Sequence, residues 1–127
     1  MTIYPVFDEV VESHDRLIDR FGGSLGLRDR GALESALARP RSGYYNDLIE
    51  EAAALWESLS QNHPFLDGNK RVAITVTAAF LALNGFRLQF EDLDAYEFLI
   101  GLYEKGTFRW KDLDTWLRDH VSQSNTG

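Results

Sequence analysis

Apolar residues recur at helical spacing along most of this chain. In residues 7–21 they follow the 3.6-residue period of an amphipathic helix, with charged residues between them. Gly22-Gly23 favours a stop at the end of this segment, since glycine is common just past the last turn of a helix. The pattern therefore predicts a first helix over residues 7–21. Its apolar positions are Val10, Val11, Leu17, Ile18 and Phe21.

A short second helix is predicted after a glycine-rich loop. The loop, residues 22–28, is interpreted as a turn. Asp29 is a good N-cap because its carboxylate can accept hydrogen bonds from the N–H groups of the first turn. Leu33 and Leu37 then fall on one face, and Pro40 ends the helix.

Asp47 predicts the start of the next helix. Glu50 follows three residues later, so a capping box is expected at this N-terminus. The helix leads toward His63. Its apolar stripe consists of Leu48, Ala52, Leu55 and Leu59.

The uncharged run from Val72 to Phe86 must belong to the core. The β-branched residues at its start favour a strand. Its length, its centre rich in alanine and leucine, and the Asn84-Gly85 stop favour a helix. We interpret residues 72–84 as a helix that is apolar nearly all round and is therefore buried in the middle of a bundle.

The rest of the chain predicts a short extended piece and two more helices. The extended piece covers Phe86 to Phe90, and the helices cover Leu93 to Lys105 and Lys111 to Val121. The expected fold class is therefore all-α, a single-domain helical bundle over residues 1–121. A flexible tail is expected at residues 122–127.

Composition fits one globular domain and excludes several classes of function. Of the 127 residues, 44% are apolar and 13% are aromatic, which is enough to bury a core without disulfides. Acidic residues outnumber basic ones by 20 to 13, and the formal charge of −7 argues against direct binding of nucleic acid. The chain has no cysteine, so disulfides and thiolate metal sites are excluded.

No membrane association is expected either. The longest uncharged run, Val72 to Phe86, is too short to span a bilayer. Residues 1–5 lack the basic region and the apolar core of a secretory signal. We expect a cytoplasmic protein.

The densest chemistry lies between His63 and Arg71, in the stretch His-Pro-Phe-Leu-Asp-Gly-Asn-Lys-Arg. It combines an imidazole, a carboxylate, a turn glycine and two adjacent cations, which is a set suited to handling phosphate. The structural alternatives are that His63 only ends a helix, with its ring satisfied by a backbone carbonyl, and that Asp67 only caps the next helix. Against them, Lys70 and Arg71 lie at a predicted helix N-terminus, where cations are unfavourable unless an anion binds.

Other candidates carry weaker signals. The stretch from Gly22 to Gly26 lacks the Gly-Lys-Ser/Thr of a P-loop. His14 and His120 are isolated and are interpreted as structural or exposed, and no His/Cys cluster suggests zinc. Tyr44 and Tyr45 either contact a partner or pack down. The one local excess of positive charge before the motif consists of Arg28, Arg30, Arg39 and Arg41.

The stretch at 63–71 resembles the motif of the Fic/Doc family, His-x-Phe-x-(Asp/Glu)-(Gly/Ala)-Asn-(Gly/Lys)-Arg. The resemblance covers roughly the whole chain, because the segments Phe21 to Asp29, Leu33 to Leu37 and Phe80 to Gly85 look like the Doc branch, the death-on-curing toxins. Adenylylating Fic enzymes usually carry Gly where this chain has Lys70 and a second Arg where it has Ile74. The chain therefore resembles Doc at both positions.

This resemblance implies a mostly helical Fic/Doc-type toxin with protein kinase activity. Such a toxin uses ATP and Mg²⁺ to phosphorylate a threonine of elongation factor Tu, and so inhibits translation. By resemblance, His63 is the general base, Asp67 holds Mg²⁺ and Phe65 anchors the loop in the core. The residues implied to bind the nucleotide phosphates are Gly68, Asn69, Lys70 and Arg71.

Two alternatives remain open. The first is an adenylyltransferase that moves AMP to a protein hydroxyl, against which Lys70 and Ile74 count. The second is a non-catalytic binding module of the same fold, against which the intact His63 and Asp67 count.

Inhibition by a partner is also implied. The chain lacks the Ser/Thr-x-x-x-Glu-Gly/Asn helix that restrains many Fic enzymes, so a separate Phd-like antitoxin is expected. An acidic amphipathic segment of that partner is expected to bind near the arginines of residues 28–41.

Overall fold

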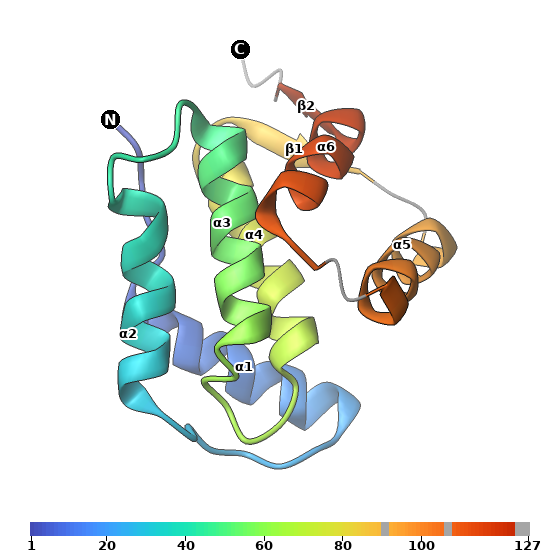
Figure 1. The fold of residues 1–127 in the computed structure, drawn as a ribbon. Helices are drawn as coiled ribbons and strands as arrows, with labels where there is room; N and C mark the ends of the chain where they lie inside the picture. Colours follow the sequence, from blue (N-terminus) through green and yellow to red (C-terminus); the bar gives the residue numbers. More distant parts are fainter. Residues whose placement is uncertain (90–91, 106–107, 124–127) are drawn as a thin grey trace.

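The chain folds into a mostly helical body, seen in Figure 1, and the predicted fold class is confirmed. This computed structural model describes residues 1–89, 92–105 and 108–123. No helix in these ranges is both long enough and apolar enough to cross a bilayer. In chain order the elements are α1 (Phe7–Phe21), α2 (Arg30–Ala38), the 3₁₀ turn η1 (Arg39–Arg41), α3 (Leu48–Gln61), α4 (Asn69–Leu83), β1 (Phe86–Leu88), α5 (Asp92–Lys105), α6 (Trp110–His120) and β2 (Val121–Gln123).

The core lies between α3 and α4, which pack against each other at the centre of the molecule (Figure 1). Helix α4 has the predicted buried face, on which Val72, Ala73 and Phe80 have no exposed surface. It is less enclosed than its sequence suggests, because Leu83 keeps 54% of its surface exposed. Helix α3 is covered more completely, and each residue from Ala52 to Trp56 is at most 1% exposed. Packing of α2, α4 and α6 around α3 explains this difference, since α4 has fewer neighbours of its own.

Two predicted helix caps are present. Asp29 Oδ1 accepts a hydrogen bond from the Ala32 N–H at 3.0 Å, and Asp47 Oδ1 accepts one from the Glu50 N–H at 2.9 Å. The expected capping box differs in one detail, because Glu50 Oε1 accepts from the N–H of Asn46 and not from that of Asp47. Each cap satisfies N–H groups that the first turn of a helix leaves without partners.

Asp47 also forms an ion pair with α6. Arg118 Nη2 lies 2.9 Å from Asp47 Oδ2, which ties the start of α3 to the last turns of α6. Partial burial acts to raise the pKa of Asp47, but the Glu50 N–H and the Arg118 guanidinium outweigh it and hold the pKa below its usual value.

The C-terminal part contains a small sheet that the all-α prediction reduced to one extended piece. β1 pairs antiparallel with β2, so that Phe86 is opposite Gln123 and Leu88 is opposite Val121. The boundary predicted for the tail, at residue 122, is therefore too early, because Ser122 is paired with Arg87. Residues 124–127 of that tail, and Phe90 of the predicted extended piece, lie outside the described residues.

Two loops lie at opposite ends of α3 (Figure 1). The loop at residues 62–68 connects α3 to α4 at one end, beside the segment at 22–29. The loop at residues 42–47, with its aromatic pair, precedes α3 at the other end. A helix of 14 residues is about 21 Å long, so the aromatic loop is remote from the motif.

Candidate active site

The residues of the motif form a loop that is paired with a distant part of the chain. Leu27 and Phe65 form an isolated antiparallel bridge. The N–H of Leu66 donates to the carbonyl of Gly26 at 3.0 Å, and the N–H of Arg28 donates to the carbonyl of Pro64 at 2.7 Å. The glycine-rich segment at 22–28, which we interpreted as a turn, is therefore a structural partner of the motif loop. Its sequence carried no signal for this pairing beyond its glycines.

His63 is held in an unusual backbone conformation. Its φ is +48°, the left-handed region that residues other than glycine rarely adopt, and such a residue stores about 1–3 kcal/mol of strain. The Arg28 side chain bridges this turn, with Nε 2.5 Å from the His63 carbonyl oxygen and Nη2 3.0 Å from that of Asn62. Strain of this kind is common at functional sites, where the surrounding structure holds it in place.

The His63 side chain is exposed. None of the hydrogen bonds within the described ranges involves its imidazole, so the alternative of a histidine satisfied by a backbone carbonyl does not fit. An exposed imidazole on a fixed backbone is available to a substrate.

Asp67 lies four residues further along, and its carboxylate is oriented by two backbone N–H groups. Oδ2 accepts from Ser24 at 3.1 Å, and Oδ1 accepts from Gly68 at 2.8 Å. The N-cap of α4 is Gly68, with no capping side chain. Asp67 is therefore not the helix cap that the structural alternative predicted. Each carboxylate oxygen can accept further bonds, so the exposed Asp67 keeps sites for a ligand.

The loop is closed by Asn69 around a buried aromatic anchor. Asn69 Oδ1 accepts from the N–H of Phe65, and its Nδ2 donates to the Phe65 carbonyl, both at 2.9 Å. Phe65 is 1% exposed, in the anchoring position that the resemblance implies. The Asn69 amide thus serves loop closure through Oδ1 and one N–H of Nδ2, and its second N–H is not used in these bonds.

The N-terminus of α4 has the features of an anion site. Gly68 has a φ of +74°, which glycine adopts without strain, and the helix starts directly after it. Lys70 and Arg71 are both exposed in the first turn, which has no acidic residue. The positive end of the helix dipole lies at the same place, so charge repulsion there favours a bound anion. The Arg71 guanidinium is 4.1 Å from the centre of the Phe21 ring.

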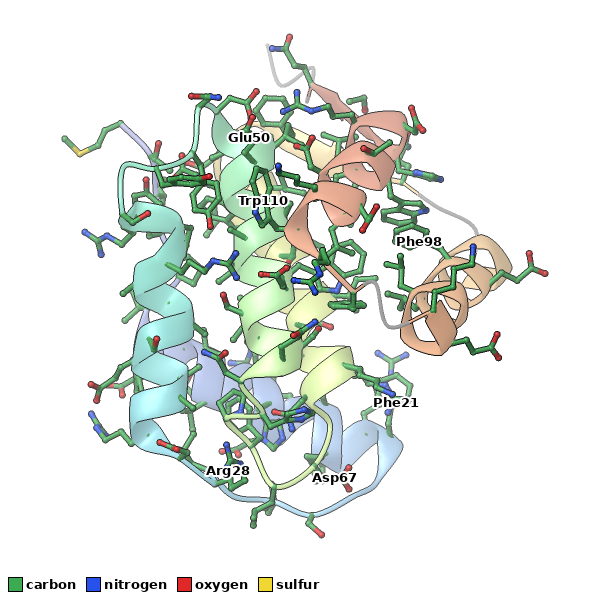
Figure 2. All side chains as sticks on the ribbon, in the orientation of Figure 1. Phe21, Arg28, Glu50, Asp67, Phe98 and Trp110 are labelled. Carbon is green, nitrogen blue, oxygen red and sulfur yellow. The ribbon has the colours of Figure 1, made fainter. Side chains whose placement is uncertain are left out.

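Figure 2 shows Arg28, Asp67 and Phe21 at this end of the molecule, with Glu50 and Trp110 at the opposite end. The exposed Tyr44 and its neighbour Tyr45 pack edge-on against Trp110, so the aromatic pair contacts α6 and not the motif.

The arginines expected to form a basic strip are mostly engaged within the fold. Arg30 pairs with Glu34, and Arg39 forms an ion pair with Glu57. Arg28 bonds the carbonyls beside His63, as described above. The strip therefore offers less free positive charge than its sequence suggests.

His14, from α1, is the site residue that the sequence analysis missed. It is 1% exposed, and its Nε2 lies 2.7 Å from the carbonyl oxygen of Asp67. A signal was present, because Val10, His14 and Ile18 recur every four residues on the buried face of α1. The other isolated histidine, His120, contacts the Trp116 carbonyl through Nδ1 at 2.7 Å, within α6.

The described residues contain no group of three or more His, Cys, Asp or Glu side chains that could hold a metal ion. Asp67 is the acidic group of the motif loop, and Mg²⁺ in nucleotide sites is commonly held by one or two carboxylates together with phosphate oxygens and water. The donor set thus fits a metal that arrives with a nucleotide, and not a metal held by the protein alone.

The chain is similar in sequence to known proteins over more than half of its length. A sequence model of the Fic/DOC family matches residues 5–81. The chain is 43% identical over 86 residues to "Toxin Doc" of Mycolicibacterium smegmatis, a match that covers 63% of this chain and 66% of that protein. It is 34% identical over 85 residues to "Protein kinase doc" of Escherichia phage P1, which covers 64% of this chain and 68% of that protein. The match thus spans about two thirds of each relative.

Proposed function

The chain belongs to the Fic/DOC family, in its Doc branch, and from this premise we propose that it is a Doc-type toxin that transfers the γ-phosphoryl group of ATP to a threonine of a translation factor. Elongation factor Tu is the proposed target. The observation that carries the proposal is an exposed, backbone-strained His63 at the start of the loop that leads to a helix N-terminus with two exposed cations.

His63 is the proposed general base. It takes the proton of the target hydroxyl, the hydroxyl oxygen attacks the γ-phosphorus, the bond from that phosphorus to the β-phosphate oxygen breaks, and ADP leaves. Arg28 supports this role, because it holds the backbone carbonyls of Asn62 and His63 in place. The backbone that carries the imidazole is thus fixed, and so is the direction from which the imidazole approaches the hydroxyl.

The remaining motif residues are proposed to stabilise charge. Mg²⁺, when bound with the nucleotide, would supply electrostatic stabilisation of the phosphates. Asp67 would hold it, because its carboxylate is exposed and is oriented by Ser24 and Gly68. Lys70 and Arg71, with the first N–H groups of α4, would bind phosphate oxygens.

Two positions favour phosphate transfer over AMP transfer. By the resemblance, Lys70 occupies the position that is usually Gly in adenylylating Fic enzymes, so its side chain would fill space that distal phosphates need. Ile74 packs against the hydrophobic core, which leaves that position without a cation for those phosphates. A nucleotide bound in the opposite direction would instead bring its γ-phosphate to His63.

Labelled ATP tests this assignment. The protein is incubated with elongation factor Tu and either γ-labelled or α-labelled ATP, with His63→Ala as the control. Label from the γ position is expected on a threonine in the wild-type reaction and not with the variant. Transfer of only the α label would identify an adenylyltransferase, and absence of both would leave the binding module as the better explanation.

A separate antitoxin is the proposed partner. An apolar groove between α1 and α4 is proposed to receive an apolar side chain from an amphipathic segment of such a partner. Val6 and Leu83 line the groove and are each 54% exposed. The other apolar lining residues are Pro5, Val10, Val76, Ala79 and Phe80.

A further inference from the structure

A buried histidine on α1 contacts the underside of the motif loop. The His14 ring stacks on Phe65, with 3.8 Å between the ring centres and 7° between the planes. Its Nε2 lies 2.7 Å from the carbonyl oxygen of Asp67, a residue 53 positions away. Because a carbonyl oxygen can only accept, Nε2 carries the proton in this bond.

This hydrogen bond determines how the peptide group between Asp67 and Gly68 is oriented. A peptide unit is planar and trans, so its N–H points opposite to its C=O. With the Asp67 carbonyl directed at His14, the N–H of Gly68 faces away from α1, and there it donates to Asp67 Oδ1 at 2.8 Å. One side of the peptide is thus bonded to His14 and the other side to the Asp67 carboxylate.

The fit around Gly68 leaves little freedom for another arrangement. A Cβ at this residue would lie 3.3 Å from Ile18 Cδ1 and 3.5 Å from His14 Nε2. Glycine therefore allows α1 to approach the loop closely enough for the bond to Asp67 to form.

Packing alone does not explain a histidine at position 14. Its Nδ1 is buried and has no hydrogen-bond partner within the described ranges. A buried polar atom without a partner destabilises a fold, and an apolar side chain would fill the same space without that cost. The contact with Asp67 supplies a reason for this residue that packing does not.

We infer that His14 is a positioning residue for the Asp67 carboxylate: it fixes the Asp67–Gly68 peptide from below, and the Gly68 N–H then holds the carboxylate in the direction that binds a nucleotide-bound divalent cation. This inference rests on the proposed function, since it takes Asp67 as the metal ligand. Residues that orient a metal ligand commonly change metal affinity or activity by about 10- to 100-fold when replaced.

Two nearly isosteric substitutions separate the donor from the bulk. His14→Gln keeps an amide N–H that reaches the place of Nε2, whereas His14→Met has similar length and no donor. His120→Met serves as a control, because it removes a similar bond from a ring nitrogen to a carbonyl, within α6.

The primary readout is the affinity for ATP at a series of Mg²⁺ concentrations, measured by calorimetry without any protein substrate. His14→Met is expected to weaken Mg²⁺-dependent ATP binding by about 10- to 100-fold relative to His14→Gln, at similar melting temperatures. His120→Met should leave this binding at the wild-type level. In the ¹⁵N NMR spectrum, the Gly68 amide resonance should shift in His14→Met and stay near its wild-type position in His14→Gln.

Equal Mg²⁺-dependent ATP affinity in the Gln and Met variants would overturn the inference. So would a loss in His120→Met as large as that in His14→Met. If His14→Met does not fold, His14→Gln is judged alone: a Gly68 resonance and an ATP affinity that both stay at the wild-type level, or that both change, support the inference, and a change in one without the other contradicts it. Failure of the wild-type protein to transfer phosphate would refute the proposed function alone, since the binding comparison does not depend on transfer.

Discussion

The glycine-rich segment leaves no room for a side chain at Gly23, beside Asp67, and this allows a sharp test of the role of Asp67. A Cβ built on Gly23 would lie 2.6 Å from Asp67 Oδ2 and 3.1 Å from Ile18 Cδ1. A Cβ on the neighbouring Gly22 would have no atom within 4 Å. Both residues have positive φ, +117° at Gly23 and +88° at Gly22. Gly23→Ala and Gly22→Ala are therefore a matched pair that differ mainly in the contact with Asp67.

The expected size of the effect follows from these distances. In either variant an alanine in a backbone conformation suited to glycine costs about 1–3 kcal/mol of stability. In Gly23→Ala, Oδ2 must also move by about 0.8 Å, from 2.6 Å to the 3.4 Å at which ordinary contact begins. That movement displaces the oxygen that accepts the bond from the Ser24 N–H. Misplacement of a catalytic group on the order of 1 Å can cost about 100-fold in rate.

The assay compares γ-phosphoryl transfer by the two variants at equal concentrations of folded protein. We expect kcat/KM at limiting Mg²⁺ to be about 10- to 100-fold lower for Gly23→Ala than for Gly22→Ala. Excess Mg²⁺ should recover part of the difference, because it compensates for a weakened ligand. Urea unfolding should give similar stabilities for both. If the two variants have equal kcat/KM at limiting Mg²⁺, then the position of the Asp67 carboxylate does not matter for the reaction and its assignment as a metal ligand is wrong.

Four further predictions address the base, its support, the groove and the cap. His63→Ala should abolish toxicity and labelling while melting temperature and helical circular dichroism stay near wild type; a fully toxic variant would contradict the assignment. Arg28→Ala should lower transfer by about 10-fold or more, because the His63 turn loses its support, whereas Arg30→Ala, on a surface pair, should not. Leu83→Asp should prevent rescue of growth by a co-expressed antitoxin without reducing toxicity; unchanged rescue would exclude the groove. Asp47→Asn should be less stable than wild type at pH 7, and the difference in free energy of unfolding should narrow toward pH 3. The reason is that a carboxylate with a lowered pKa stabilises the fold above about pH 4, and this stabilisation is lost as pH falls through the folded-state pKa. Urea unfolding at both pH values checks this, and an equal difference at both would refute it.

Local sequence was enough to determine most of the helices. Asp29 and Asp47 mark helix starts because a short carboxylate side chain satisfies N–H groups only two or three residues away. The first helix was predicted with its observed bounds, Phe7–Phe21, because its period and its glycine stop are both local signals. The motif was also recognisable, since its histidine, carboxylate, glycine and cations are all within nine residues.

Tertiary structure alone decided what supports that motif. The Arg28 side chain reaches a carbonyl 35 positions away, and His14 reaches one 53 positions away. The pairing of Leu27 with Phe65 and the two-stranded sheet at the C-terminal end likewise join distant segments. Contacts of this kind depend on how whole helices pack, so no periodicity or spacing within a short window of sequence encodes them. The sequence by itself therefore determined the helices and the reacting groups. How those groups are held was determined by the packing of α1 and of the segment at 22–29 against the motif loop. The reason is that the orientation of a side chain depends on contacts between elements.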